Sequence, residues 1–222
     1  YDKKNHLSFN GEIYNYLNLR QKYKVPDKYF IHKTDTEILY YLLNQKHFDL
    51  SELNGMWSFA HYNSERHVLK IGRDILGERN LYYYVNKNEL IFSSEIRPIF
   101  AANKLSFSVD NIGVQDMWKY YACRDNLTII KNCYKLTPGT YITFEKKNDS
   151  FFSKTSIPIL SLENNYDLLK GKTLKFAEKK FQELLYDELK LRLPNKVKSF
   201  SQLSGGIDSS FQNILLSKFK KL

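Results

Sequence analysis

The chain has 222 residues, of which 42% are hydrophobic and 15% aromatic, and its formal net charge is +10. This apolar content excludes a disordered chain and suffices for one large domain, or for one domain and part of a second. The lysines are scattered apart from one short cluster at Lys218–Lys221, so the charge favours a solvated surface over a nucleic-acid site.

Membrane and secretion signals are absent from the sequence. It contains no apolar run of about 18 residues and no signal peptide. Its two cysteines, Cys123 and Cys133, have no metal-ligand spacing with each other or with the five histidines. We therefore expect a cytoplasmic protein with reduced thiols, without a nucleophilic context at either cysteine and without a membrane or nucleic-acid partner. Because the first residue is Tyr1 and the chain opens inside a strand-like pattern, we also expect residues to precede it.

The first elements surround two short polar motifs. Leu7–Phe9 alternates like the end of a strand, Asn10–Gly11 is typical of a turn, and a short amphipathic helix is predicted from Ile13. Thr34 and Glu37 have the spacing of a capping box before a second amphipathic helix. Asp35 lies in the first turn of that helix, where an acidic residue is ordinary.

A strand-rich region follows. Residues 55–62 and 67–74 are predicted to form one hairpin, and residues 81–85 and 89–93 a second. Residues 95–100 suggest a helical turn, Asp110 caps a helix that runs to Tyr120, and a last strand covers 140–145. The pattern then decays, so residues 146–165 are the expected linker, before a long amphipathic helix over 174–189.

The last motif is Ser204–Gly205–Gly206–Ile207–Asp208–Ser209–Ser210, between a predicted strand at 200–203 and a predicted helix that includes Phe211, Ile214 and Phe219. Adjacent glycines let successive N–H groups converge on an anion, and the following helix adds the positive end of its dipole. The hydroxyls add donors, and Asp208 offers an oxygen to a metal. A Walker loop is excluded because no Lys follows the last glycine. A simple helix-capping turn is the alternative interpretation.

Seven motifs, taken in order along the chain, resemble those of the glutamine-hydrolysing asparagine synthetases. They are Phe9–Tyr16, Thr34–Glu37, Leu53–Ala60, Arg73–Tyr83, Phe92–Glu95, Leu136–Gly139 and Leu203–Ser210. Each is weak alone, and their common order makes the resemblance specific over nearly the whole length. The last of them also resembles the pyrophosphate loop of ATP pyrophosphatases. One departure is Arg79–Asn80, where the family has Lys-Pro, and we expect it to alter a turn rather than the chemistry.

The resemblance implies a fold and a domain order. Residues 1–145 would be a class II glutamine amidotransferase domain with the α+β, four-layer fold of the N-terminal-nucleophile hydrolases. Residues 146–165 would link it to residues 166–222, the incomplete beginning of an α/β synthetase domain with a parallel sheet. The chain is thus interpreted as a fragment of a longer enzyme, possible as a homodimer.

The resemblance also implies the site residues. Asn10 and Gly11 would form an oxyanion hole, and Gly11, Glu12 and Asp35 would hold the α-groups of glutamine. In such enzymes an N-terminal Cys attacks the amide and its own α-amine acts as the base. The second site would bind ATP, with Mg²⁺ at Asp208, and would adenylate aspartate before ammonia displaces AMP. Its ATP-binding residues would be Leu203, Ser204, Gly205, Gly206, Asp208, Ser209 and Ser210.

Two alternatives stay open. The acceptor could be another carboxylate, such as a sugar acid or an antibiotic precursor, or the chain could be a non-catalytic fragment. Intact Asn10, Gly11 and Asp35 argue for glutamine binding and do not define the acceptor. Because the expected nucleophile and an Arg that clamps the glutamine carboxylate are not in the sequence given, we expect these 222 residues to catalyse neither half-reaction.

Overall fold

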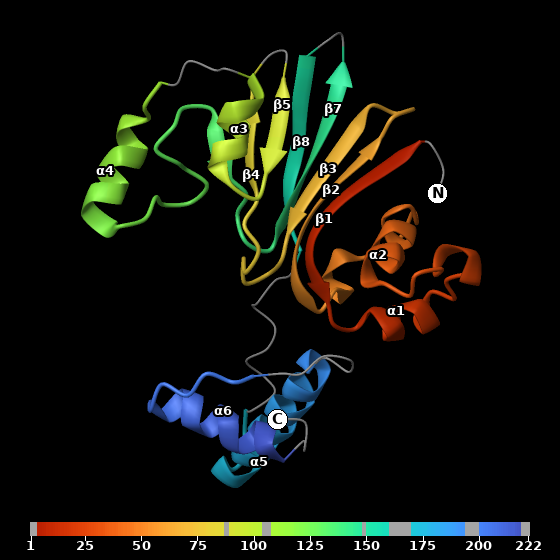
Figure 1. Ribbon diagram of the computed structural model, residues 1–222, viewed down its shortest axis with the longest axis vertical. Coiled ribbons are helices and arrows are strands. Elements are labelled where there is room, and N and C mark those ends of the chain that lie inside the picture. The colour runs from red at the N-terminus through yellow and green to blue at the C-terminus, as the bar shows by residue number, and fades with distance from the viewer. Residues whose placement is uncertain are drawn as a thin grey trace. The chain divides into compact units, whose positions relative to one another are not determined.

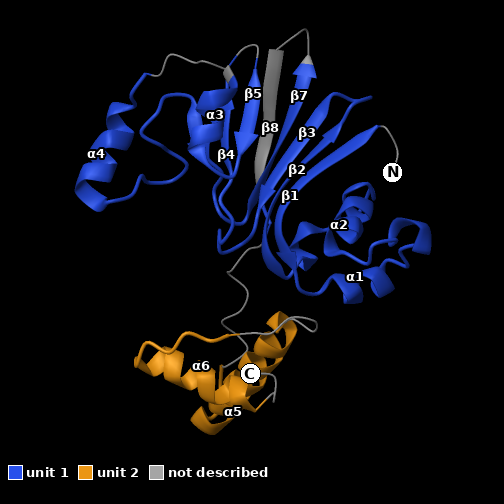
Figure 2. Cartoon of the chain, viewed as in Figure 1, with its two compact units in different colours: residues 1–161 blue, residues 162–222 orange. Residues whose placement is uncertain are grey.

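The computed structural model describes residues 4–86, 89–103, 108–147, 150–159, 170–193 and 200–218. The chain divides into two compact units, Tyr1–Ser161 and Leu162–Leu222, which are coloured separately in Figure 2.

The larger unit is built on a five-stranded antiparallel sheet (Figure 1). Its strand order is β1 (Asn5–Ile13), β2 (Gly55–Asn63), β3 (Val68–Arg73), β7 (Thr140–Lys147) and β8 (Ser150–Pro158). β2 and β3 form the first predicted hairpin, with Ser58 opposite Arg73. β1 pairs with β2 over its whole length, from Asn5 opposite Asn63 to Ile13 opposite Gly55.

A second, three-stranded sheet contains the other predicted hairpin. Its order is β5 (Leu90–Ser93), β4 (Tyr82–Val85) and β6 (Cys133–Lys135), again antiparallel. The tyrosine-rich run of β4 suits a pleated, half-buried surface, on which aromatic side chains pack well. The Tyr83 ring accordingly contacts Tyr134 of β6 in a tilted arrangement and Phe144 of β7 edge to face.

Helices lie outside both sheets. They are α1 (Tyr16–Lys22), α2 (Asp35–Leu43), α3 (Ile96–Asn103) and α4 (Asn111–Tyr120), with short 3₁₀ turns at Asp27–Tyr29 and Leu50–Glu52. The predicted caps are confirmed: Thr34 and Glu37 form a reciprocal capping box on α2, and Asp110 accepts from the first turn of α4. Each cap satisfies main-chain N–H groups that have no partner within their helix.

Two apolar clusters define the layers. One joins Ile38, Leu39 and Leu42 of α2 to Trp57 and Phe59 of β2. The other lies between the two sheets and is made of Ala60, Leu69, Ile71, Leu81, Tyr83, Leu136 and Phe144. Ile99 of α3 is fully buried yet belongs to neither cluster, because α3 packs on β4 and β5 (Figure 1). The order is therefore helices, sheet, sheet, helix, as expected for this fold class.

Two sequence-based predictions are wrong in this unit. The expected linker over 146–165 contains β8, which pairs with β7 from Thr140–Pro158 to Lys147–Ser150, and Ile159 joins the first apolar cluster. β8 is an edge strand, and an edge need not show the apolar alternation by which a strand is recognised. Residues 148–149 and 160–165 of that linker lie outside the described part.

The second error concerns Asn10–Gly11, which forms no turn. β1 continues through both residues in register with β2. Gly11 has φ +146°, and a Cβ there would lie 2.1 Å from the carbonyl oxygen of Met56. The glycine therefore serves the close approach of two backbones, a use of glycine that a sequence does not distinguish from a turn.

The smaller unit contains α5 (Leu174–Arg192) and α6 (Ile207–Ser217), so both predicted helices are confirmed. The strand expected at 200–203 is not formed, and a parallel strand would need neighbours that the described residues of this unit do not offer. Neither helix has a buried residue within its described part. Phe219 and the lysines after Lys218 lie outside the described residues.

None of the described helices combines the length and the apolar composition that a bilayer crossing requires.

Candidate functional site

The alternation of side chains along β1 separates structural from functional positions. Leu7, Phe9 and Ile13 pack into the cluster under α2. Ser8, Asn10 and Glu12 point to the opposite face, as the two-residue period of a strand requires, and all three are exposed. The predicted site residues Asn10 and Glu12 therefore share one face of one strand.

The peptide N–H of Gly11 points away from β2. Gly11 lies opposite Trp57, and both main-chain groups of Trp57 are used on its other side. The Trp57 carbonyl accepts from Asp74 N at 2.8 Å, and the Trp57 N–H donates to Asp74 Oδ2 at 3.2 Å. In an antiparallel pair, two opposite residues either exchange both bonds or turn both away from each other. Gly11 is thus in the second kind of pair, and its N–H faces the outer edge of β1, which no described strand covers.

Asp35 lies along the same edge. Its Oδ2 accepts the N–H of Ile13 at 2.9 Å, and its Oδ1 accepts the N–H of Thr36 at 2.7 Å. Ile13 has the same outward orientation as Gly11, and two residues of a strand span about 6.7 Å. The Asp35 carboxylate is therefore anchored next to the Gly11 N–H. Its Oδ1 also accepts from the Thr36 hydroxyl at 3.3 Å, whereas Oδ2 keeps a lone pair for a further donor.

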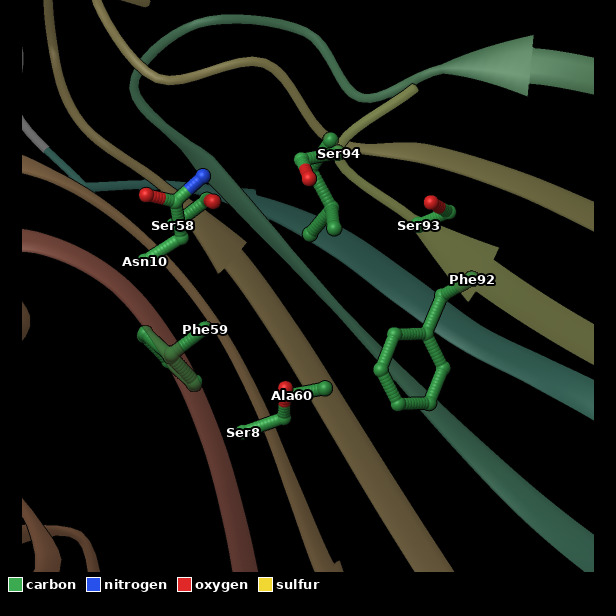
Figure 3. Close-up of a pocket in the computed structure, with 9 residues that line it drawn as sticks. Ser8, Asn10, Ser58, Phe59, Ala60, Phe92, Ser93 and Ser94 are labelled. Atoms are coloured by element: carbon green, nitrogen blue, oxygen red, sulfur yellow. The ribbon is translucent and has the colours of Figure 1, made fainter. Parts of the chain in front are cut away.

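A small pocket opens beside Asn10, on the side of β1 that faces away from α2. Its volume is about 220 Å³, below the roughly 300–1,000 Å³ of sites for drug-sized ligands, so it suits a smaller molecule. Figure 3 shows Asn10 and Ser58 on one wall, and Phe92, Ser93 and Ser94 on the other. The lining residues are Ser8, Asn10, Ser58, Phe59, Ala60, Leu81, Phe92, Ser93 and Ser94.

A buried pair of charged residues supports the strand behind this site. Arg73 and Asp74 are 2% and 1% exposed. Arg73 donates to the carbonyls of Arg79 (2.8 Å), Leu136 (2.8 Å) and Gly77 (2.5 Å), and to Asn80 Oδ1 (2.8 Å). Burial lowers the pKa of the Arg73 guanidinium, although the nearby Asp74 opposes the change. Asn80, the departure from the family pattern, is thereby part of this network.

Neither cysteine is an activated thiol. Cys133 is buried and Cys123 half-buried, and both are free. Burial raises the pKa of each thiol, for Cys123 together with the negative charges of Asp116 and Asp110. A raised pKa keeps sulfur protonated and a poor nucleophile, which agrees with the sequence-based interpretation.

The predicted anion loop has an open helix N-terminus. Gly206 is the N-cap of α6 and no side chain caps that end, while Ser204 and Ser209 approach each other at 2.9 Å between their hydroxyl oxygens. Gly205 has φ +82°, a value that glycine adopts without strain. Asp208 lies in the first turn. No group of three His, Cys, Asp or Glu side chains suited to a metal occurs in the described ranges.

Comparison with known proteins shows the family of the chain. Residues 1–154 match the family model described as glutamine amidotransferase domain. The chain belongs to this family. The class II amidotransferase domain of the N-terminal-nucleophile type, with its antiparallel sheets and helices, is thereby confirmed.

Curated relatives connect the domain to asparagine synthetases. A Methanocaldococcus jannaschii protein, named for a glutamine-hydrolysing asparagine synthetase, is 34% identical over 208 residues, which are 92% of this chain and 38% of the relative. Asparagine synthetase 1 of Bacillus subtilis is 29% identical, over 92% of this chain and 31% of its own. Amidase chry2 of Gibberella zeae is also 29% identical, over 92% and 30%. The chain spans about a third of the length of these relatives.

The structure places Asn10, Gly11 and Glu12 on β1, and Asp35 binds the N–H of Ile13 at the end of the same strand. It places the 204–210 loop in the other unit. Sequence reasoning missed the serines of the pocket and the support that Asp74 gives to Trp57. The polar alternation of Ser8, Asn10 and Glu12 was a usable signal for the pocket-facing side of β1.

Proposed function

We propose that this chain carries the glutamine-binding site of an ATP-dependent amidotransferase of the asparagine synthetase type. The observation that carries the proposal is the outward N–H of Gly11, next to the Asn10 side chain and the Asp35 carboxylate. Hydrolysis of a carboxamide passes through a tetrahedral intermediate with one negative oxygen, and two convergent N–H donors stabilise that oxygen. Asn10 Nδ2 and Gly11 N are the proposed donors.

The remaining residues would orient the substrate. Asp35 is a fixed negative charge suited to the ammonium group of glutamine, and Glu12 offers a second carboxylate on the pocket-facing side of β1. Gly11 allows a ligand to approach the backbone because it has no side chain. The nucleophile is proposed to be a cysteine other than Cys123 and Cys133, whose thiols stay protonated.

Loop 204–210 is proposed as the phosphate cradle for ATP. Main-chain N–H groups at the start of α6 and the hydroxyls of Ser204, Ser209 and Ser210 would donate to the pyrophosphate. Asp208 would contribute an oxygen to Mg²⁺, which neutralises phosphate charge when bound. The acceptor carboxylate, aspartate in this proposal, would be adenylated and then amidated by ammonia.

The alternative proposal is that the acceptor is a carboxylate other than aspartate, such as a sugar acid or an antibiotic precursor. The observation that favours it is the 29% identity to a protein named Amidase chry2. Glutamine binding is common to both proposals, because the residues proposed for it, on β1 and at Asp35, take no part in the choice of acceptor. The two are distinguished by the acceptor that is consumed in the full-length protein when ATP and glutamine are supplied.

Glutamine binding can be tested on the chain itself by ¹H–¹⁵N NMR. We expect L-glutamine to shift the Asn10 side-chain amide and the Gly11 N–H resonance. Asp35→Asn should weaken binding at least about tenfold, because one charge-assisted hydrogen bond is lost while an oxygen remains for the Ile13 N–H. Asp27→Asn, an exposed carboxylate that pairs with Arg20, is the matched control and should bind as the unmodified chain does. Glutamine that shifts no resonance of β1 would refute the proposal.

A further inference from the structure

Asp74 follows the last residue of β3 and makes the two hydrogen bonds to Trp57 that a longer β3 would make. Its main-chain N–H donates to the Trp57 carbonyl at 2.8 Å, as the next ladder bond would. The returning bond is made by its side chain, because Trp57 N donates to Oδ2 at 3.2 Å. The Asp74 carbonyl is thereby free to accept from Gly77 N (3.1 Å) and Gly139 N (2.8 Å).

The carboxylate also closes the following loop. Oδ1 accepts the N–H of Glu78 at 2.9 Å, and Oδ2 accepts the N–H of Arg79 at 3.0 Å. The neighbouring Arg73 holds the carbonyls of Gly77 and Arg79 in the same loop. Asp74 is therefore fixed from both sides, and so is the Trp57 peptide that it binds.

This arrangement has a consequence on the far side of β2. The two main-chain groups of Trp57 are committed to Asp74, so they are unavailable to Gly11 directly opposite. The Gly11 N–H must then face the outer edge of β1. Ser58, the next residue of β2, lies opposite Asn10 and donates its hydroxyl to the carbonyl of Asn80 at 3.4 Å, in the loop that Arg73 and Asp74 hold.

We propose that Asp74 is a positioning residue for the Gly11 amide: by holding the Trp57 peptide it sets the direction of the donor on the neighbouring strand. The identity of the ligand rests on the proposed function, whereas the orientation of Gly11 does not. Asp74 touches no ligand in this proposal and acts through Trp57 alone.

Asp74→Asn tests the proposal. An amide has one acceptor oxygen, so it cannot accept from Glu78 on one side and from Trp57 and Arg79 on the other. Asp116→Asn is the matched control, since Asp116 is also buried (2% exposed) and its carboxylate also accepts two N–H bonds. Asp116 lies on α4, and the donors are N and Nε of Arg124 in the turn that follows this helix.

We expect Asp74→Asn to move the Gly11 N–H resonance without any ligand and to weaken glutamine binding at least about tenfold. Asp116→Asn should leave the Gly11 resonance in place and the affinity within about twofold, at a comparable loss of thermal stability. Unchanged Gly11 resonance and affinity in Asp74→Asn would overturn the proposal, and so would equal changes in both variants.

Hydrogen exchange of the unmodified chain provides a second measurement, which decides the matter if Asp74→Asn does not fold. The Trp57 N–H should exchange at least about a hundredfold more slowly than the Gly11 N–H, because only the first is bound within the sheet. Equal protection of the two would overturn the proposal. If the unmodified chain binds no glutamine, the proposed function fails, and the Gly11 resonance and exchange rates still decide the role of Asp74.

Discussion

Gly11 differs from Gly139, another glycine with positive φ, in the space around its Cα. At Gly11 a Cβ would lie 2.1 Å from the Met56 carbonyl oxygen, whereas at Gly139, with φ +64°, the nearest atom would be 3.5 Å away. Gly11→Ala should therefore lower the free energy of unfolding by about 2–4 kcal/mol, from backbone strain plus overpacking. Gly139→Ala should cost only the strain of a left-handed conformation, roughly 1–2 kcal/mol.

Urea denaturation followed by tryptophan fluorescence measures both effects, because Trp57 and Trp118 lie in the larger unit. If Gly11→Ala were no more destabilising than Gly139→Ala, the close approach of β1 and β2 at this point would be wrong.

Tyr23 and Glu52 form a pH-dependent pair on the helical side of the larger unit. The Tyr23 hydroxyl donates to Glu52 Oε1 at 2.7 Å, and this bond, with burial, raises the pKa of Tyr23 to about 12. Hydrogen bonds from Lys22 and Tyr23 lower the pKa of Glu52. The stabilisation from Glu52 is present above its ordinary pKa and is lost as the pH falls through the lowered value. The stabilisation from Tyr23 is present below its ordinary pKa and is lost as the pH rises towards about 12.

Glu52→Gln should return the pKa of Tyr23 towards its ordinary value of 10.0. The tyrosine ¹³Cζ resonance reports this ionisation directly. Glu65→Gln, which removes an exposed partner of Lys4, is the control and should leave the Tyr23 titration unchanged. A Tyr23 titration that is the same with and without Glu52 would contradict the hydrogen bond.

At the scale of elements, α2 is the support of Asp35. Its cap, Thr34, accepts the Glu37 N–H, and Asp35 is the next residue. Thr34→Ala should lower the free energy of unfolding of the larger unit by about 1 kcal/mol. It should also weaken glutamine binding, because the first turn of α2 holds the Asp35 carboxylate.

Thr173→Ala provides the comparison for this prediction. Thr173 caps α5 in the other unit by accepting the Phe176 N–H. Tryptophan fluorescence reports only the larger unit, so its unfolding midpoint should fall for Thr34→Ala and stay constant for Thr173→Ala. Equal midpoints in all three proteins would mean that the α2 cap contributes nothing.

The elements that were predictable from the sequence share one property, which is a distinctive pattern of residues within the element itself or directly beside it. The hairpins β2–β3 and β4–β5 have polar turns between apolar runs, and the caps Thr34 and Asp110 have side chains suited to the role. β8 and the absent strand at 200–203 depend instead on which neighbours are available, and local pattern does not contain that information.

The candidate site was predictable in its residue types and less so in its geometry. The resemblance assigns Asn10, Gly11 and Asp35 to the site, whereas the position of Asp35 in the first turn of a helix alone indicates only a capping-region acid. That Gly11 belongs to a strand, and that Asp35 holds Ile13, follows only from the register of β1 on β2. Register depends on long-range pairing, so no reading of residues 9–16 alone supplies it.

At the scale of the whole chain, the two units should differ in stability. The larger unit has two apolar clusters, whereas α5 and α6 bury no residue and leave Phe181 and Ile214 60% exposed. Limited proteolysis should therefore cleave within 170–218 well before it cleaves within residues 5–147. Mass spectrometry of the fragments identifies the sites. Equal resistance of the two regions would show that the smaller unit is stabilised by interactions beyond its described helices.

Because one proposed donor is the main-chain N–H of Gly11, mutations should affect the proposed site differently from a site made of side chains alone. A main-chain N–H donor is kept by every replacement except proline, so ordinary substitutions do not delete it as Asn10→Ala would delete the other donor. Substitutions other than proline can only turn or block it. Tolerance to substitution should therefore be low at residues that set strand register and peptide direction, such as Gly55 and Asp74, although neither would meet the ligand. A mutational scan interpreted only by ligand contacts would therefore miss residues on which glutamine binding depends.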